Sequence, residues 1–245
     1  MKKLIYTILP SDNLEEFNLI RLFHQSVRNI YAKEEVEFGV ICKSNTWLRL
    51  NLNETHISNT SLFSDLDEDH PFNSILNVPG KNDYCANKFL IHELIPYNQY
   101  SLITYLDYDS IVCADFLSDI EDLSSLHLHS YNDSDTPHSG LFSFYPCQAT
   151  EKLFKDIYKN YLDNILFDFG SYIKEHADNI KLSFNITNMV WSYVPTAENM
   201  ERKFINFGKA NMKQLPDIWK FNGNKISCSN KLSAMNKCLE LCKNV

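Results

Sequence analysis

The sequence predicts an α/β fold in which helices flank a mainly parallel central sheet. Two observations carry this prediction. Short apolar runs rich in β-forming residues alternate along the chain with amphipathic stretches of helical period, and polar or proline-containing turns separate them. No internal repeat or low-complexity linker divides the 245 residues. We therefore expect one domain over residues 1–245.

The first unit of this fold is a strand followed by a helix. Residues 3–9 are apolar and β-forming, and Asp12 and Glu15 behind them are spaced as a helix capping box. The apolar spacing then predicts a helix over residues 14–31, and residues 38–42 are typical of a second strand. The expected buried face of the helix consists of Leu14, Phe17, Ile20, Phe23, Val27 and Ile30.

The rest of the chain gives signals of uneven strength. From residue 44 to 80 the pattern indicates only loops and short strands. Beyond it we expect, in order, a helix capped by Asn82 or Asp83 and ending at residue 93, a fully buried strand over 101–106, a strand over 140–145, a helix capped by Thr150, an amphipathic segment over 184–194 and a packing helix over 232–242.

Composition excludes several classes of protein. A content of 44% hydrophobic and 13% aromatic residues is typical of a folded chain and argues against disorder. The net charge of −8, without a cluster of Lys or Arg, argues against nucleic-acid binding. No apolar run is long enough for a transmembrane segment. The seven scattered cysteines lack metal-binding spacing, so we expect reduced thiols and a cytoplasmic protein.

Two aspartates directly follow the predicted strand over 101–106. Side chains on a strand alternate between its faces, so Asp107 and Asp109 are expected to project the same way at its carboxyl end. Neighbouring carboxylates repel each other unless a proton or a cation lies between them. Mn²⁺ or Mg²⁺ commonly binds carboxylates together with substrate phosphates. The pair predicts a metal site that holds a diphosphate; an ordinary acidic turn is the alternative.

The aspartates belong to a longer recognisable block. Residues 87–96 read NKFLIHELIP and residues 101–112 read SLITYLDYDSIV. A helix ending in a Pro-Glu-Leu-Leu-Pro-like sequence, followed by a strand of the type Val-Leu-Tyr-Leu-Asp-Ala-Asp-Thr-Leu-Val, is the pattern of glycosyltransferase family 8, the glycogenin and galactinol-synthase-like group. The chain resembles this family, which implies a Rossmann-like GT-A fold and catalytic metal ligation by the two aspartates.

Two further stretches agree with the resemblance in order. Residues 6–13, YTILPSDN, resemble the opening strand and nucleotide-contacting turn of the family. Residues 138–142, HSGLF, resemble the strand whose start faces the donor sugar. The resemblance implies that Thr7, Ile8 and Leu9 line the base and ribose pocket.

Three more residues are assigned to the donor site by the same resemblance. Lys88 stands where the family has an Arg close to the donor, and Tyr108 lies between the two aspartates. His138 replaces an Asn of the family, and a structural histidine is the alternative interpretation. A cation at Lys88 suits an acidic protein that binds a nucleoside diphosphate.

The C-terminal part departs from the family pattern. The expected His-x-x-Gly-x-x-Lys, which supplies a third metal ligand and a phosphate-binding Lys, is missing, and the last histidine is His176. The nearest stretch is NFGK at residues 206–209. Asn206 is the candidate third metal ligand, and Lys209 or Lys213 is the candidate phosphate-binding residue.

The motif that contacts sugar and acceptor in the family is also poorly preserved. The family's Asp-Gln-Asp-x-Leu-Asn is echoed by NITN at residues 185–188, and DN at residues 178–179 is a competing placement. Asn185 and Asp178 are therefore both kept as catalytic candidates.

The resemblance implies a metal-dependent glycosyltransferase with Mn²⁺ or Mg²⁺ as its cofactor. The donor would be a nucleoside-diphosphate sugar, with UDP favoured and GDP possible, and the acceptor a hydroxyl of a glycan, lipid or protein. Residues 1–115 would form the nucleotide-binding half and residues 116–245 the sugar and acceptor half. The stereochemical outcome stays open.

Two other functions are compatible with the sequence. A sugar-nucleotide or glycan-binding module without turnover would explain the missing C-terminal histidine. A phosphatase of the haloacid-dehalogenase type also places Asp-x-Asp at a strand end, with the first Asp as nucleophile. That motif normally opens its domain, whereas here it follows about 100 residues of chain.

Overall fold

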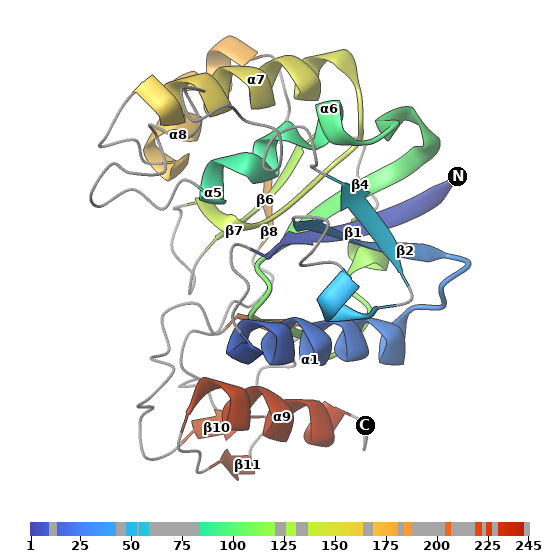
Figure 1. Cartoon of the computed structure of the whole chain (residues 1–245). Coiled ribbons are helices and arrows are strands. Elements are labelled where there is room, and N and C mark those ends of the chain that lie inside the picture. Colours follow the sequence, from blue (N-terminus) through green and yellow to red (C-terminus); the bar gives the residue numbers. More distant parts are fainter. Residues whose placement is uncertain are drawn as a thin grey trace.

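The described part of the chain is built around one mixed sheet of seven strands (Figure 1). The computed structural model describes residues 1–9, 14–42, 48–52, 54–58, 84–120, 126–130, 137–163, 169–180, 184–187, 204–206, 219–221, 224–226 and 230–242. The strands are, in spatial order, β3 (Thr55–Ser58), β2 (Val36–Cys42), β1 (Lys2–Ile8), β4 (Tyr100–Leu106), β7 (Pro137–Phe144), β6 (Leu126–Ser130) and β8 (Phe184–Thr187).

Strand direction confirms the mainly parallel sheet. β1 runs parallel to β2 and β4, β2 to β3, and β6 to β8. β7 is antiparallel to both of its neighbours, β4 and β6. The carboxyl ends of β1 and β4 therefore meet the amino end of β7 at one edge of the sheet, where ligands bind in open α/β sheets.

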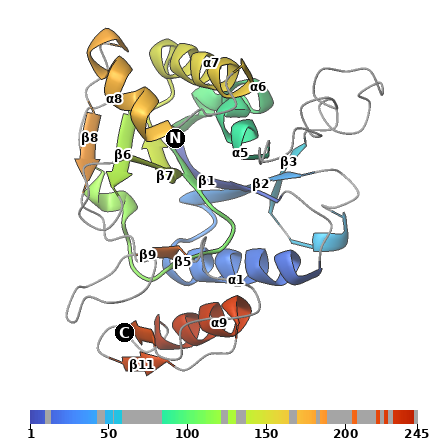
Figure 2. The ribbon, with the colours of Figure 1, turned by 90° about the vertical axis from the view of Figure 1, so that its left-hand side faces the viewer.

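Helices cover both faces of the sheet (Figure 2). On one face, α1 (Leu14–Ile30) buries Phe17, Ile20, Phe23 and Val27 against a cluster that includes Ile5. On the other face, α7 (Gln148–Asp163) and α8 (Phe169–Ile180) pack on the sheet through aromatic rings, edge-on for Phe154 of α7 and stacked for Phe169 of α8. The helix α9 (Lys231–Cys242) packs against α1 and lies below it in Figures 1 and 2.

Most of the expected elements are present, with small shifts at their ends. The helix over 14–31, the strands over 3–9, 38–42, 101–106 and 140–145, and the tail helix correspond to α1, β1, β2, β4, β7 and α9. Leu14 is 65% exposed and does not belong to the buried face of α1, since the helix begins there beyond the edge of the core. The short strand β3 falls within the weak region 44–80.

The helix expected to end at residue 93 is broken into three pieces. α5 (Tyr84–Asn87) passes into the 3₁₀ turn η1 (Lys88–Leu90) and then into α6 (Ile91–Leu94). All three residues of η1 are buried, and the tighter turn holds them against the sheet. The proposed cap residues, Asn82 and Asp83, lie outside the described residues.

The structure corrects one other local prediction and specifies a second. Thr150 does not cap α7, which begins at Gln148; instead its Oγ1 accepts a 3.0 Å bond from the amide of Cys147 within the first turn. The amphipathic segment predicted over 184–194, to which the sequence assigns no secondary structure, begins as the edge strand β8. Its residues from 188 onward lie outside the described chain.

Short strands that were not predicted complete the fold. β5 (Ser110–Val112) pairs antiparallel with β9 (Phe204–Asn206), and β10 (Trp219–Phe221) pairs with β11 (Asn224–Ile226). Three-residue strands carry too little periodicity to be recognised in sequence. Within the described ranges, no helix combines the length and apolarity needed to cross a bilayer.

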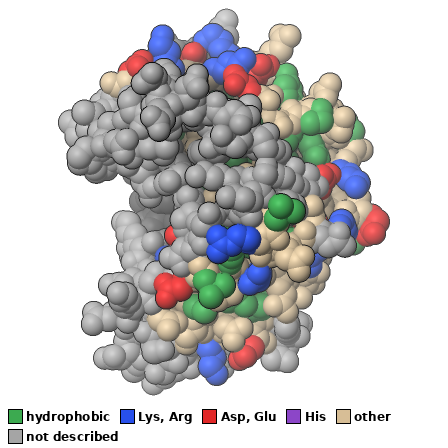
Figure 3. All heavy atoms as spheres, in the orientation of Figure 1, with side chains coloured by type: hydrophobic (Ala, Val, Ile, Leu, Met, Phe, Trp, Pro, Cys, Tyr) green, Lys and Arg blue, Asp and Glu red, His purple; other side chains and the backbone are tan. Residues whose placement is uncertain are grey.

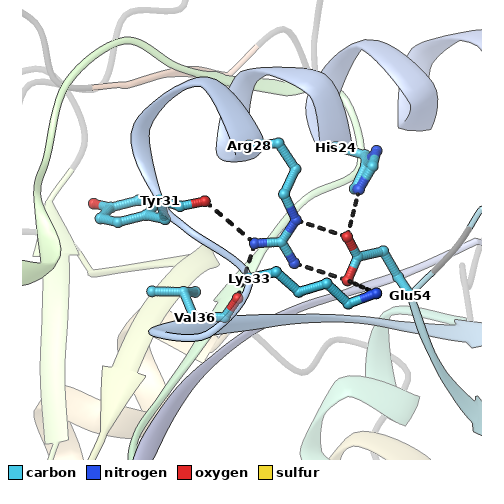
Figure 4. Close-up of polar contacts among 6 residues, drawn as sticks. All are labelled: His24, Arg28, Tyr31, Lys33, Val36 and Glu54. Atoms are coloured by element: carbon cyan, nitrogen blue, oxygen red, sulfur yellow. Dashed lines mark hydrogen bonds and ion pairs between the residues drawn. The ribbon is translucent and has the colours of Figure 1, made fainter.

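A buried carboxylate braces the end of α1 against the start of β3 (Figure 4). Glu54, whose side chain is 4% exposed, accepts hydrogen bonds of 2.6 and 2.8 Å from Arg28 and lies 2.9 Å from His24. Arg28 also donates to the carbonyl of Val36 at 2.8 Å. Burial opposes ionisation of Glu54, but the bonds from Arg28 and His24 outweigh it and lower its pKa below the ordinary value.

We expect Glu54→Gln to destabilise the protein by about 2 kcal/mol or more at pH 7, because Arg28 loses its buried anionic partner. Because the folded-state pKa of Glu54 is lowered, its contribution is present at neutral pH and disappears as the pH falls through that pKa. Urea denaturation at pH 7 and pH 4 measures both effects. Equal stability of the variant and the wild type at pH 7 would contradict a stabilising role for Glu54.

A surface pair provides the control for this variant. Charged side chains of both signs gather over α7, at the top of Figure 3. There the exposed pair of Lys152 and Asp156 lies on solvated helix surface, 2.7 Å apart. Asp156→Asn is expected to change stability by less than about 0.5 kcal/mol.

His92 of α6 is a second buried titratable group. Its ring packs against Tyr97, Phe144 and Phe154, and its Nε2 lies 3.3 Å from Oγ1 of Thr150. Burial lowers the pKa of His92 from 6.5 to about 4. The side chain is therefore neutral at pH 7 and folds as part of the aromatic core.

Acidification from pH 6.5 to pH 4 should lower the free energy of unfolding of the wild type by up to about 3 kcal/mol through His92. The reason is that His92 binds a proton in the unfolded chain over this range, whereas burial opposes protonation in the folded chain. His92→Asn, which binds no proton in this range, should show a correspondingly shallower loss. Denaturant titrations of both proteins between pH 7 and pH 4 test this expectation. Parallel stability profiles would refute it.

Candidate active site

Asp107 lies at the carboxyl end of β4, beside the start of β7. Its amide donates a 3.0 Å hydrogen bond to the carbonyl of Gly140, and its Oδ1 accepts a 2.8 Å bond from the hydroxyl of Tyr105. The predicted HSG stretch of β7 and the first aspartate are thus neighbours. The carboxylate is half-buried and oriented by a phenol from its own strand.

The second aspartate does not continue the strand. β4 ends at Leu106, and Tyr108 and Asp109 form a turn that leads into β5, so strand alternation does not set the direction of Asp109. Its Oδ2 instead lies 2.8 Å from Nζ of Lys231, the first residue of α9. Both side chains are 7% exposed. One carboxylate of the predicted pair, that of Asp109, therefore forms a buried ion pair with Lys231.

Opposing effects act on ionisation of Asp109. Burial raises its pKa above the ordinary value, the ammonium of Lys231 opposes that rise, and the nearby charge of Asp107 adds to it. The pKa is raised on balance. The 2.8 Å contact with an ammonium group still favours the carboxylate form at neutral pH.

The side chains present at the site can be compared with the ligands that a divalent metal ion requires. Across the described ranges, no group of three or more His, Cys, Asp or Glu side chains could hold an ion. Asp107 accepts from Tyr105, and Asp109 accepts from Lys231. As arranged, the two carboxylates do not fit a divalent ion held by both, because an ammonium already lies at one of them. Mn²⁺ or Mg²⁺ stays a prediction.

The C-terminal part returns to this turn at β9. Asn206 is in register with Ser110, the residue that follows Asp109. The backbone of the candidate third ligand therefore lies next to the acidic turn, although its side chain is outside the described atoms. Lys209 and Lys213 lie outside the described residues.

Lys88 enters the same region from η1. Its Nζ donates to the carbonyl of Ser139 and lies 4.7 Å from the centre of the Tyr105 ring. Its backbone carbonyl accepts a 2.6 Å bond from the hydroxyl of Tyr6, which fixes η1 on the sheet. The residue is 2% exposed, and no carboxylate among the described residues pairs with it. A buried ammonium without an anion is costly, although the ring face of Tyr105 offsets part of that cost.

Two further buried polar atoms accompany Lys88. Oγ1 of Thr7 and Oδ1 of Asn87 have no hydrogen-bond partner within the described structure. Both residues lie near the carboxyl end of β1, where the resemblance places the nucleotide. Ile8 and Leu9 are buried at the same strand end, and the amide of Leu9 donates 3.0 Å to the carbonyl of Ile41.

The other predicted residues lie in different surroundings. Tyr108 packs against the apolar cluster between α1 and the sheet and against the apolar cluster that joins α9 to α1. Its hydroxyl donates to Glu16 of α1 at 3.3 Å. His138 lies in β7, one residue before Ser139, and its side chain is not described. Asn185 is on the edge strand β8, three strands from β4. Asp178 is in α8, and its side chain is likewise not described.

Lys231 is a residue of the candidate site that sequence reasoning missed. It lies 122 positions from Asp109 in the sequence and is the first residue of the tail helix α9, one position before the predicted start of that helix. The sequence indicates Tyr105 only as a strand residue, yet it contacts both Lys88 and Asp107. The alternation of the strand places Tyr105 and Asp107 on one face, and this was the available signal for Tyr105.

Comparison with known proteins identifies the fold. No protein-family profile and no curated sequence matches the chain. The galactosyltransferase LgtC, solved with donor and acceptor sugar analogs, aligns with a TM-score of 0.59 and 11% identity over 99% of this chain and 96% of its own. Mouse xyloside xylosyltransferase 1 aligns with a TM-score of 0.51 and 11% identity, covering 84% of this chain and 96% of its own.

A third structure gives the same result. A glycosyltransferase involved in glycosylation of the major capsid of PBCV-1 aligns with a TM-score of 0.52 and 9% identity, covering 84% of this chain and 94% of its own. These matches confirm the predicted GT-A glycosyltransferase fold over most of the chain.

We expect the ion pair of Asp109 and Lys231 to be visible in a double-mutant cycle. Asp109→Asn and Lys231→Met should each destabilise the protein by about 3 kcal/mol, because each leaves a buried charge without its partner. The double variant should lose clearly less than the sum of the two. Additive losses in urea denaturation would show that the two side chains do not interact.

Proposed function

We propose that the chain is a glycosyltransferase that moves a sugar from a nucleoside-diphosphate sugar to a hydroxyl of a glycan, lipid or protein. UDP is the favoured nucleotide, and GDP is possible. The observation that carries the proposal is the buried ammonium of Lys88, which lies over the ring of Tyr105 on a GT-A fold and has no carboxylate partner among the described residues.

A diphosphate supplies what this ammonium lacks. Lys88 donates one hydrogen bond, to Ser139, so two of its three N–H donors have no acceptor among the described residues. A phosphate oxygen would accept from them and compensate the buried charge. The orphaned oxygens of Thr7 and Asn87 would accept hydrogen bonds from a ribose hydroxyl or a base N–H.

Positioned charge would then assist the reaction. In glycosyl transfer the bond between the anomeric carbon and the diphosphate breaks, and its electron pair leaves with the diphosphate. The acceptor hydroxyl forms the new bond to that carbon, and its proton passes to solvent. Lys88 would stabilise the negative charge that grows on the leaving group. Asp107, held by Tyr105 at 2.8 Å, would orient the donor by accepting hydrogen bonds from its hydroxyls.

A second form of this proposal includes a divalent metal ion. With Mn²⁺ or Mg²⁺ bound by Asp107, Asp109 and Asn206, a Lewis acid would share the neutralisation of the diphosphate. That version requires Lys231 to leave Asp109, so no step above depends on it. Asn185 and Asp178 remain catalytic candidates on the resemblance alone.

A thermal-shift panel of UDP- and GDP-sugars, each with Mn²⁺ and with EDTA, tests the proposal. At least one nucleotide sugar should raise the melting temperature, because a ligand that binds only the native state stabilises it. Lys88→Met should lower the affinity for that nucleotide sugar by about 10- to 100-fold through the loss of a charge-assisted hydrogen bond. Lys152→Met, at an 80% exposed site, is the matched control and should bind normally.

The outcomes separate the alternative functions. Binding followed by transfer, or by slow hydrolysis of the sugar nucleotide, supports the enzyme. Binding without any turnover indicates a sugar-nucleotide-binding module. Hydrolysis of simple phosphoesters without nucleotide-sugar binding would favour the phosphatase, and no response to the panel would remove the main support for a transferase.

A further inference from the structure

The acidic turn already holds a cation that comes from the far end of the chain. Nζ of Lys231 lies 2.8 Å from Oδ2 of Asp109, across 122 residues of sequence. Both side chains are withdrawn from solvent. A buried carboxylate requires a compensating positive charge, and here the protein supplies that charge itself.

Packing fixes the position of this ammonium. Asn230 caps α9, because its Oδ1 accepts a 2.8 Å bond from the amide of Ser233, and Lys231 is the first residue of the helix. Lys231 is therefore presented to Asp109 by a packed helix end rather than by a loop. The apolar residues that hold α9 against α1 and β5 are Leu19, Ile111, Ala234, Met235, Cys238 and Leu239.

The ammonium of Lys231 opposes the binding of a second cation at the carboxylate of Asp109. A divalent ion on Asp109 would lie close to the ammonium of Lys231, and like charges repel strongly at short range in a buried site. Metal binding there would require the ammonium of Lys231 to leave Asp109. The arrangement fits an ammonium better than a metal ion.

We propose that Lys231 is the built-in counter-cation of the Asp107 and Asp109 pair and takes the place of a divalent ion at Asp109. The consequence for catalysis rests on the function proposed above. If the donor is a nucleoside diphosphate, its charge is balanced by side-chain ammonium groups, and its binding does not depend on Mn²⁺.

Titration calorimetry with MnCl₂ alone, without nucleotide, tests the proposal. Lys231→Met frees Asp109 while leaving both carboxylates in place, so this variant should bind Mn²⁺ at least about tenfold more tightly than the wild type. Adding Asp109→Asn to it should abolish the gain. The control is Lys237→Met, which removes a 58% exposed charge from the same helix and should match the wild type.

Two results of the Mn²⁺ titrations would overturn the proposal: Mn²⁺ binding by the wild type that Asp109→Asn abolishes, or a folded Lys231→Met variant without increased Mn²⁺ affinity. Circular dichroism establishes that each variant is folded, and Lys231→Gln serves if the Met variant is not. A second measurement uses only the wild type and UDP. Equal UDP affinity in Mn²⁺ and in EDTA supports the proposal, and UDP affinity that requires Mn²⁺ overturns it.

The two proposals can fail separately. If UDP and the nucleotide sugars bind under neither condition, the proposed glycosyltransferase function fails. The Mn²⁺ titrations of the Lys231 variants still decide whether this residue is the counter-cation, since they contain no nucleotide.

Discussion

The buried ion pair of Asp109 and Lys231 is the constraint on which the arrangement of the candidate site depends. It joins the turn after β4 to the first residue of α9, and α9 packs on α1 and β5. β5 in turn pairs with β9, so Asp109 and the strand that follows it are both held by the C-terminal part of the chain. Charge compensation and apolar packing therefore fix the same contact.

The two buried ammonium groups of the site differ in what surrounds them. Lys231 has a carboxylate at 2.8 Å, whereas Lys88 has a backbone carbonyl and the face of Tyr105. A compensated charge is a structural element that resists removal. A charge without an anion, in contrast, favours the binding of one, so the two lysines are suited to different roles.

Strand direction explains why these groups meet. Because β7 runs against β4, its amino-terminal residues lie beside the carboxyl end of β4, and the carbonyls of Ser139 and Gly140 reach Lys88 and Asp107. A parallel strand at this place would have brought its carboxyl end there instead. The reversed strand thus completes a site that begins with the parallel strands β1 and β4.

The sequence by itself determined the α/β class, the main helices and strands, and the position of Asp107 at a strand end, because these follow from local periodicity and from short motifs. It also indicated Lys88 and the HSG stretch through their order along the chain. Only the tertiary structure decided that Asp109 turns toward Lys231, that Tyr105 joins Lys88 to Asp107, and that Asn206 returns beside Ser110. Except for the contact of Tyr105 with Asp107, which strand alternation indicates, these contacts join residues on different elements, up to 122 positions apart. Local periodicity carries no information about such distant pairs.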